Sequence, residues 1–473
     1  MELLNNLVGI VNELLWSKVL IIMLITLGLY FTFRTKFVQF RFFGEMFRLL
    51  GDGAKGEKKE GAVSSFQAFC ISTASRVGTG NIAGIAMAVV AGGPGSVFWM
   101  WLIALIGSAS SFVESTLAQI FKIKDGEGFR GGPAYYMEQG LKSKGMGVAF
   151  SILITICFGF IFNAVQSNTI TAAFNNAFGM NRLVIGLILA ALTGVIIFGG
   201  VHRVAKVSEI IVPIFAVLYI LVSLFVVVIN IGEIPGIIKA IFESAFGLRE
   251  MAVGSMSGMI LVGIKRGLFS NEAGMGSAPN AAATADVTHP VKQGLIQTLG
   301  VFTDTIVICS CTAFMILLYS DYATAGLEGI ELTQAALSSQ IGPIGNIFIA
   351  ICILLFAFSS IVGNYYYGES NIEFMSKNKT ILNVFRAMVV GMVLFGSVAK
   401  VQLVWDLADV FMGIMAVINL VAIALLGKYA FIALNDYLAQ KKAGIKEPVF
   451  NASNIEGLEN VECWKEEIEE KAV

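Results

Sequence analysis

Two short stretches inside long apolar runs combine glycine, asparagine and an arginine. They are RVGTGNIAGIAMA (76–88) and RGLFSNEAGMGSA (266–278), and their gapless alignment matches at arginine, asparagine, alanine, glycine and alanine. Glycine breaks helices and frees backbone N–H and C=O groups, which protein or a water-filled cavity must satisfy at membrane depth. At such a break N–H groups bind a carboxylate, whereas carbonyl groups bind a cation or an ammonium group. The two stretches therefore predict one polar site near the middle of a membrane.

The composition indicates that these stretches lie in an integral membrane protein. The chain has 473 residues, of which 56% are hydrophobic and 14% charged, and its mean hydropathy is +0.78. Soluble domains carry about 25% charged residues. The net charge of −1 gives no field that would attract nucleic acid. We expect a lipid bilayer around the chain, a location in the plasma membrane, and no nucleic acid as a partner.

Eleven runs have the length that a membrane-spanning helix needs, which is about 20 mostly apolar residues. The predicted spans are 16–34, 62–91, 95–121, 147–174, 183–200, 207–230, 253–280, 292–318, 343–373, 382–399 and 403–434. Glu2 and Glu13 stand where a signal peptide would have basic residues, so we expect the first run to be retained as a span. The six cysteines form no CxxC pair, which favours packing roles.

The Lys and Arg residues of the connections predict the orientation. With the N-terminus outside, the inner connections and the tail hold 26 of the 32 Lys and Arg residues, and the outer connections hold four. We therefore expect the N-terminus outside and the C-terminus in the cytoplasm. The tail, 435–473, is polar and charged, and we expect it to be solvated and partly disordered, without a function of its own.

The two similar stretches lie in the second and seventh predicted spans, which run in opposite directions through the membrane. Chance similarity between segments rich in small residues is the alternative explanation. Five spans separate the pair, which is typical of an inverted-topology repeat. The predicted fold is an all-α polytopic membrane protein with one extra N-terminal helix and a 5+5 inverted repeat containing two broken helices. Its parts are 1–61, 62–252, 253–434 and the cytoplasmic tail 435–473.

Other polar residues in the predicted spans could line the same site. Asn163, Gln166 and Ser167 share one helical face, and we expect Gln166 to face the cavity, although hydrogen bonds between helices are an equally good explanation for each residue. Ser359 and Ser360 would either bond to their own helix or, beside an unwound carbonyl strand, bind Na⁺, which prefers oxygen ligands.

Charged residues at membrane depth are functional hypotheses by default. They are Arg76, Glu114, Glu209, Glu272, Asp304 and Glu369. Arg76 and Glu272 lie in the two broken stretches and would neutralise each other, either as a structural ion pair or as ligands. Asp304 would couple protons. The remaining three glutamates would lie nearer the cytoplasmic interface.

The motifs of several enzyme classes are missing. Gly78, Gly80 and Ala83 fit GxGxxA, but no strand precedes them and no acid follows about 20 residues on, so we expect no dinucleotide site. No HExxH, GxSxG or Walker A motif is present. We expect no enzyme activity and no organic cofactor, and an ion gradient would supply the energy.

Four segments carry a family resemblance: ISTASRVGTGNIAGIAMAVVAGGPGSVFWMW, FRGGPAYYMEQGL, KRGLFSNEAGMGSAPNAAA and the YYGE at 366–369. With them, essentially the whole chain resembles the alanine or glycine:cation symporter family, also called the sodium:alanine symporters. The family belongs to the amino acid, polyamine and cation superfamily. The resemblance therefore implies the leucine-transporter fold, with a 5+5 inverted repeat and sites at two broken helices.

The resemblance also implies a substrate site. The N–H groups of Thr79 and Gly80 would bind the substrate carboxylate, and carbonyl groups at this break and near Phe269 and Ser270 would bind its ammonium group. Phe269 and Met275 would contact a small side chain. The residues expected at the substrate are Ser75, Gly78, Thr79, Gly80, Gln166, Phe269, Ser270, Asn271, Gly274, Met275 and Gly276.

A sodium site follows from the same resemblance. Its implied ligands are the carbonyl groups of Ala74, Val77 and Phe356 and the hydroxyl groups of Ser359 and Ser360. A second sodium site would involve Asn81 and Ser270, although Asp304 stands where a neutral oxygen ligand is expected. Asn364 also departs from the family, since a bulkier aromatic residue is expected after the glycine, and this affects the expected pocket size.

The leading hypothesis is a sodium-coupled symporter that imports alanine or glycine by alternating access. The alternatives are a proton-coupled amino-acid transporter and a ligand-gated channel or sensor on the same scaffold. A membrane-embedded enzyme has no nucleophile and base pair to support it. The sequence leaves open the preference among alanine, glycine and serine, the tolerance of D-enantiomers, the coupling stoichiometry and the oligomeric state.

Overall fold

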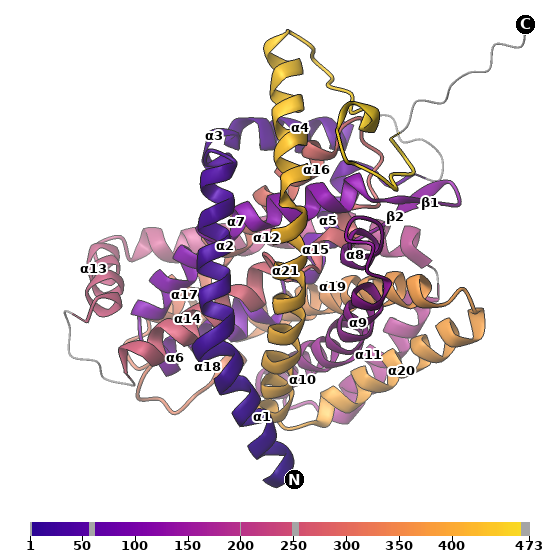
Figure 1. Ribbon diagram of the computed structural model, residues 1–473. Helices are drawn as coiled ribbons and strands as arrows, with labels where there is room; N and C mark the ends of the chain where they lie inside the picture. The colour runs from indigo at the N-terminus through magenta and orange to yellow at the C-terminus, as the bar shows by residue number, and fades with distance from the viewer. Residues whose placement is uncertain (1, 56–61, 199, 248–254, 465–473) are drawn as a thin grey trace, which may run out of the picture.

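The computed structural model describes residues 2–55, 62–198, 200–247 and 255–464. These residues form a bundle of helices with one short β-hairpin at an end of the molecule (Figure 1). The predicted all-α class is confirmed. The hairpin pairs Ile123 with Arg130, and its strands are too short to form a core.

The helices follow one another along the whole chain. The α-helices are α1 (Glu2–Leu14), α2 (Ile21–Arg34), α3 (Val38–Arg41), α4 (Phe43–Lys55), α5 (Ser65–Arg76), α6 (Ile85–Gly92), α7 (Gly95–Ile120), α8 (Pro133–Gln139), α9 (Lys144–Ile154), α10 (Asn163–Phe178), α11 (Arg182–Ile197), α12 (Gly200–Ile229), α13 (Ile234–Ala245), α14 (Met256–Asn271), α15 (Ala278–Ala282), α16 (Pro290–Val301), α17 (Ser310–Leu317), α18 (Gly329–Ile341), α19 (Ile344–Met375), α20 (Lys379–Val398) and α21 (Val401–Lys442). The strands are β1 (Ile123–Asp125) and β2 (Gly128–Arg130).

Four π-helical turns and one 3₁₀ turn complete the secondary structure of the described residues. They are η1 (Leu15–Leu20), η2 (Gly80–Gly84), η3 (Thr155–Phe162), η4 (Phe302–Cys309) and the 3₁₀ turn η5 (Ala452–Asn454). π-Helical turns often lie at functional sites. Of the four, η2 lies in the first glycine-rich stretch, and η4 contains Asp304.

Each predicted span coincides with a helix or with consecutive helices. In the described part of the chain, eight helices are long and apolar enough to cross a membrane, or nine if the bent pair Ser65–Arg76 and Gly80–Gly92 is one span. The count of eleven stays a prediction, because α11 is short and 253–280 divides into α14 and α15. Residues 61, 199 and 252–254, at predicted span and domain limits, lie outside the described residues. The inverted repeat also stays a prediction.

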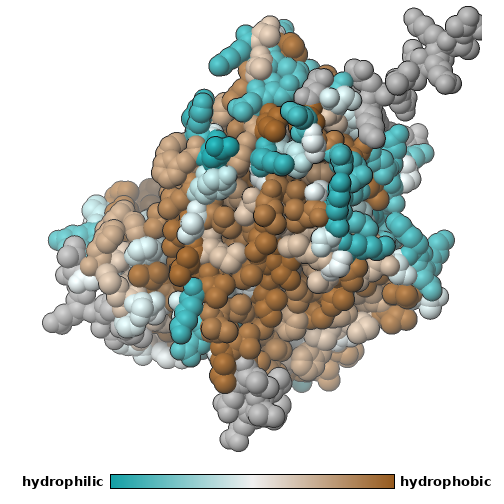
Figure 2. Space-filling model, in the orientation of Figure 1, coloured by the Kyte–Doolittle hydropathy of each residue, from teal (hydrophilic) through white to brown (hydrophobic). Residues whose placement is uncertain are grey.

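The surface agrees with a membrane location. Figure 2 shows hydrophobic residues over the middle and lower part of one face and hydrophilic residues gathered at its top and upper right. In the same orientation α1 lies at the bottom, and α21 ends at the top (Figure 1). The two ends of the described chain therefore lie at opposite ends of the molecule, as an odd number of spans requires. Which end faces the cytoplasm stays a prediction.

The first glycine-rich stretch breaks a span. α5 ends at Arg76, Val77 is extended, and the following helix starts at an angle of 48° to it. Glycine is needed here because neighbours approach closely. A Cβ atom on Gly78 would lie 2.3 Å from the Ser360 hydroxyl oxygen, and one on Gly80 would lie 2.8 Å from the Phe269 ring.

The second stretch breaks as well. α14 ends where Glu272 adopts a left-handed conformation with φ of 55°, and Gly274 and Gly276 both have φ of 83°. Only glycine adopts such angles without steric cost, so these two residues allow the chain to turn before α15. Both sequence-predicted breaks are therefore present.

The tail differs from the expectation of a solvated segment. Residues 443–464 fold back, and the Trp464 indole N–H donates to the Gln119 carbonyl at 2.8 Å. The Trp464 ring lies 5.4 Å from the Phe450 ring and 4.8 Å from the Lys122 ammonium group. A few apolar residues of the tail provide this packing. The overall composition of the tail is rich in charged residues, so it does not reveal them. Residues 465–473 lie outside the described residues.

Trp464→Ala should lower the free energy of unfolding by about 3 kcal/mol, because it removes a buried aromatic side chain that is only 8% exposed. Thermal unfolding of the purified protein in detergent measures the change. Ile445→Ala is the control, since Ile445 lies on the same tail and is 44% exposed. Equal unfolding temperatures for the two variants would contradict the observed packing.

Candidate functional site

The first break is held by side chains from other turns and helices. The Thr79 N–H donates to the Gln166 side-chain oxygen at 3.0 Å, and the Gly78 N–H donates to the Asn81 side-chain oxygen at 2.9 Å. Gln166 lies on α10 and reaches the break, and its place at the substrate cavity stays a prediction. Asn168, two residues later, instead donates to the carbonyl groups of Gly396 and Ala399, so it joins helices.

The two serines of α19 lie beside the same break. The Ser360 hydroxyl reaches the Val77 carbonyl at 3.3 Å and the Phe356 carbonyl at 3.0 Å. The Ser359 hydroxyl donates to the Phe356 carbonyl at 2.8 Å. Both serines bond to their own helix, and Ser360 also joins it to the unwound strand. These buried hydroxyl and carbonyl oxygens have the hard donor character that Na⁺ prefers.

A third polar cluster joins the two broken helices. The Asn81 side-chain N–H₂ donates to the Ser270 hydroxyl at 3.0 Å and to an Asp304 carboxylate oxygen at 2.6 Å. Ser270 donates to the other Asp304 oxygen at 2.6 Å, and Thr305 donates to it at 2.8 Å. The structure thus brings Asn81 and Ser270 together, and the Asp304 carboxylate accepts hydrogen bonds from both. Among the described residues, no three His, Cys, Asp or Glu side chains group as metal ligands.

The expected pairing of Arg76 with Glu272 is wrong. Arg76 extends toward α16, where it donates to the Gln297 carbonyl at 3.2 Å, and its Nε and Nη2 atoms have no hydrogen-bond partner. Glu272 accepts instead from Ser75 at 2.8 Å and from Ser277 at 2.5 Å. The end of α5 directs the guanidinium away from the second break, so hydroxyl groups satisfy the carboxylate.

Glu114 holds the second break, contrary to its predicted place near the cytoplasmic interface. Its two carboxylate oxygens accept from the N–H groups of Gly274 at 3.0 Å and Gly276 at 3.1 Å. The Asn419 side chain donates to Glu114 at 2.8 Å and to the Gly274 carbonyl at 2.9 Å. These two glycine N–H groups, which were expected at the substrate, are therefore taken up by Glu114.

The other two glutamates of the sequence prediction lie outside these clusters. Glu369 pairs with Arg386 at 2.7 Å, and Glu209 accepts from the Gln67 side chain at 3.0 Å.

Aromatic rings cover the site around Phe269. Its ring centroid lies 4.7 Å from that of Phe162 and 4.7 Å from that of Trp405. The Arg266 guanidinium lies 4.6 Å from the centre of the Trp405 ring and pairs with Asp409 at 2.6 Å. Sequence reasoning missed Trp405 and Asp409, although a tryptophan and an acid in a predicted span were the available signals.

The remaining expected residues lie near the second break. Met275 is fully buried, and the Asn271 side-chain oxygen accepts from the Ala273 N–H at 3.0 Å, which stabilises the turn after α14. Asn364 is also fully buried. Its side-chain oxygen lies 2.7 Å from the Ser75 hydroxyl, whereas its amide nitrogen has no partner. A polar amide therefore occupies the position where the family resemblance implies a larger aromatic residue.

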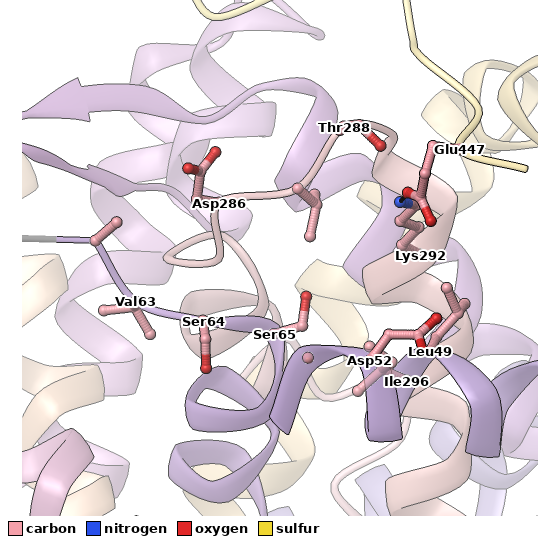
Figure 3. Close-up of a pocket in the computed structure, with 13 residues that line it drawn as sticks. Leu49, Asp52, Val63, Ser64, Ser65, Asp286, Thr288, Lys292, Ile296 and Glu447 are labelled. Carbon is pink, nitrogen blue, oxygen red and sulfur yellow. Dashed lines mark hydrogen bonds and ion pairs between the residues drawn. The ribbon is translucent and has the colours of Figure 1, made fainter. Parts of the chain in front are cut away.

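Two cavities lie on either side of this centre. One, of about 330 Å³, is lined by Met87, Asn168, Glu331 and Trp405, so Trp405 separates it from Phe269. The other, of about 400 Å³, lies between α4, the start of α5, the 286–288 segment and α16 (Figure 3). The 400 Å³ cavity thus adjoins the start of α5 and the 330 Å³ cavity adjoins η2 and α6, so the two cavities lie at opposite halves of the first broken helix.

The comparisons with known proteins agree with this geometry. Residues 1–452 match the model of the sodium:alanine symporter family. The chain is 59% identical to a probable sodium/glutamine symporter of Bacillus subtilis, GlnT, over 98% of this chain and 96% of that protein. It is 38% identical to the sodium/alanine symporter AgcS of Methanococcus maripaludis, over 89% of this chain and 94% of that protein.

Solved structures show the same fold. The crystal structure of MhsT in complex with L-phenylalanine matches with a TM-score of 0.53 and 17% identity, over 80% of this chain and 96% of that chain. Such neighbours are transporters with the leucine-transporter fold. The chain therefore belongs to the sodium:alanine symporter family and is a multi-pass membrane transporter, not an enzyme. Membership supports sodium-coupled transport of amino acids.

Glu114→Ala should lower both the unfolding temperature and the rate of uptake, because it leaves two backbone N–H groups buried without partners and removes one of the two acceptors of the Asn419 side-chain N–H₂. Each such group costs about 1–3 kcal/mol. Glu114→Gln should be milder, since it keeps one accepting oxygen. Ser111→Ala is the control on the same helix, because the Ser111 hydroxyl has no partner to lose. Glu114→Ala behaving like Ser111→Ala in thermal unfolding would contradict the support role.

Proposed function

We propose that this member of the sodium:alanine symporter family imports a small neutral amino acid, alanine or glycine, together with Na⁺ by alternating access. The observation that carries the proposal is the meeting of the two broken helices. Asn81, beside the first break, bonds to Ser270, beside the second, at 3.0 Å. Unwound backbone at membrane depth is tolerated only where protein covers it or where it lines a cavity. Such paired breaks are typical of substrate and ion sites in transporters.

The substrate carboxylate binds at the N–H groups of Thr79 and Gly80. In the structure Gln166 accepts the Thr79 N–H, so its amide oxygen occupies the position that a carboxylate oxygen takes on binding. The ammonium group binds carbonyl groups at this break and near Phe269 and Ser270. The side chain lies against Phe269 and Met275. The rings of Phe162 and Trp405 close around Phe269, which favours a small substrate.

Sodium binds between the first break and α19. Its ligands are the carbonyl groups of Ala74, Val77 and Phe356 and the hydroxyl groups of Ser359 and Ser360. The hydrogen bonds of Ser360 to Val77 and Phe356 support this, because they place three of the five oxygens together. A second sodium ion would lie by Asn81 and Ser270, where Asp304 supplies a negative charge.

Alternating access would open the two cavities in turn. The N-terminus lies outside, and the protein works in the plasma membrane with eleven spans arranged as one plus five plus five. The pairing of Arg266 with Asp409 and the aromatic contacts of Phe269 close the side of the 330 Å³ cavity. Opening this side requires these contacts to separate.

A second candidate substrate is glutamine. The relative with 59% identity is named as a probable sodium/glutamine symporter, and the buried Asn364 amide nitrogen without a partner would suit a carboxamide oxygen. Alanine offers no such acceptor on its side chain. The two substrates therefore differ in whether Asn364 gains a hydrogen bond.

Reconstituted protein should accumulate labelled alanine only under an inward Na⁺ gradient, and unlabelled glycine should compete. Vesicles with equal Na⁺ on both sides are the control. Equal accumulation with and without the gradient would contradict sodium coupling. Glutamine would be established as the substrate if it competed more strongly than alanine in the wild type and if Asn364→Ala abolished this difference. Single-channel currents far above carrier rates would indicate a channel.

Ser359→Ala combined with Ser360→Ala should raise the Na⁺ concentration for half-maximal uptake about tenfold or more, because loss of metal-orienting groups typically costs ten- to a hundredfold in affinity. Ser397→Ala is the matched control, since Ser397 is buried and its hydroxyl donates to the Val393 carbonyl of its own helix. An unchanged Na⁺ dependence in the double variant would remove both serines from the site.

A further inference from the structure

A short helical arm follows the first long helix. The arm, residues 36–54, starts where Lys36 and Phe37 adopt left-handed angles, with φ of 53° and 60°, and it contains α3 and most of α4. One side of it packs on the protein. Met46 and Leu49 are buried, and the buried Gln39 side chain donates to the Leu105 carbonyl at 3.3 Å. The arm is therefore fixed on the bundle and is not a free connection.

The other side of the arm carries an exposed aromatic stripe. Phe40, Phe43 and Phe47 are 50%, 41% and 55% exposed. Phe43 and Phe47 lie one turn apart on α4, with ring centroids 5.2 Å apart, and Phe40 at the end of α3 shares the neighbour Phe302 with Phe43. Phe43 also packs on Phe302 at 5.3 Å. The stripe continues the exposed apolar side of α2, where Phe33 is 64% exposed. A helix with apolar residues on both sides is typical of a membrane environment.

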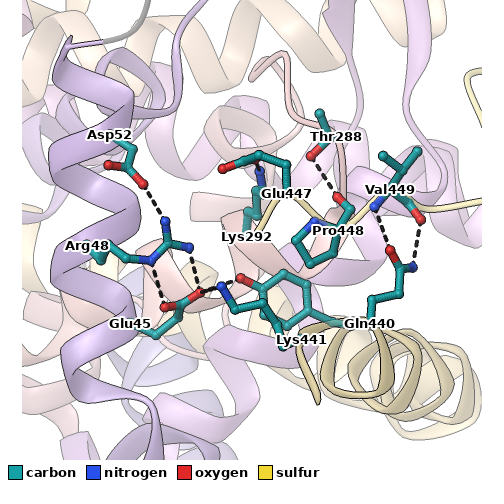
Figure 4. Close-up of polar contacts among 11 residues, drawn as sticks. Glu45, Arg48, Asp52, Thr288, Lys292, Gln440, Lys441, Glu447, Pro448 and Val449 are labelled. Atoms are coloured by element: carbon teal, nitrogen blue, oxygen red, sulfur yellow. Dashed lines mark hydrogen bonds and ion pairs between the residues drawn. The ribbon is translucent and has the colours of Figure 1, made fainter. Parts of the chain in front are cut away.

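Three cations flank this stripe without an acid partner. Arg34, Lys36 and Arg41 are exposed, and within the described ranges none of them forms an ion pair. Arg48 differs, because Glu45 and Asp52 both bind it (Figure 4). The hydrogen bond to Arg48 lowers the pKa of Glu45 to about 2, so Glu45 stays charged and neutralises Arg48. Arg34 lies 5.2 Å from the centre of the Phe431 ring, and Arg41 donates to the Lys36 carbonyl at 3.2 Å. Since these partners are neutral, the charges of the three cations remain available to an outside anion.

We propose that the arm lies in the membrane interface and binds anionic phospholipids. The stripe of Phe40, Phe43 and Phe47 enters the acyl region, while Arg34, Lys36 and Arg41 contact head-group phosphates. Charge complementarity and the continuity with the exposed side of α2 favour lipid over a protein partner. An amphipathic helix with cations beside a Phe-rich face binds anionic membrane surfaces in this manner.

The arm also forms a wall of the 400 Å³ cavity (Figure 3). A Cβ atom on Gly53 would lie 2.8 Å from that of Ser65, so the arm touches the first turn of the first broken helix. Glu45 accepts from the Tyr437 hydroxyl at 2.6 Å, which ties the arm to α21. Lipid binding to the arm would therefore stabilise the protein and alter transport, whichever amino acid is carried.

The test uses purified full-length protein in nanodiscs of phosphatidylcholine, alone or mixed with phosphatidylglycerol. The wild type should retain phosphatidylglycerol through purification in native mass spectra and unfold at a higher temperature in the mixture. The triple variant Arg34→Gln, Lys36→Gln, Arg41→Gln should lose most of both effects, because each basic residue near the surface is worth on the order of fivefold in lipid binding.

Two further variants separate charge from folding. The first is the triple variant Lys377→Gln, Lys379→Gln, Lys446→Gln, which removes three exposed cations outside the arm and should keep the lipid response. The second is the triple variant Arg34→Lys, Lys36→Arg, Arg41→Lys, which keeps the three positive charges and should also keep the lipid response. A triple Gln variant that binds phosphatidylglycerol like the wild type would overturn the proposal. A second result would also overturn it: a wild-type protein that is a dimer in phosphatidylcholine, together with a triple variant Phe40→Ser, Phe43→Ser, Phe47→Ser that is a monomer. The stripe would then bind a second copy of the chain.

Discussion

Backbone groups freed inside a membrane protein must find partners, and the architecture of this chain depends on that constraint. Water cannot reach a buried break freely, so each unpaired N–H or C=O group costs free energy. The first break is satisfied by Gln166 and Asn81, and the second by Glu114 and Asn419. Helices α7, α10 and α21 are thus positioned by what the two breaks require.

The partners of the two breaks differ in kind. Both carboxyl oxygens of Glu114 bind glycine N–H groups, so the second break is held at two points. Gln166 is neutral and binds one N–H group of the first break. A carboxylate ligand replaces the single hydrogen bond to a neutral amide oxygen more readily than two hydrogen bonds to one side chain, because hydrogen bonds to charged acceptors are stronger. The first break is therefore the better place for an exchangeable ligand.

Sequence reasoning located the helices and both breaks, since apolar length and glycine are local signals. The polar face of its span singled out Gln166, and the family resemblance implied a site shared by Asn81 and Ser270, which the structure brings together. The role of Glu114 was missed because its partners lie 160 and 162 residues away. The direction of Arg76 depends on α16, and no local pattern reveals it. The tail was misjudged because its charges outnumber the few aromatic residues that anchor it.

The folded tail makes a contact that can form only late in synthesis of the chain. Trp464 bonds to Gln119, which precedes it by 345 residues, and residues 443–464 follow the last helix. The ribosome therefore completes every span before this contact can form. Until then the Lys122 ammonium group lacks the Trp464 ring beside it.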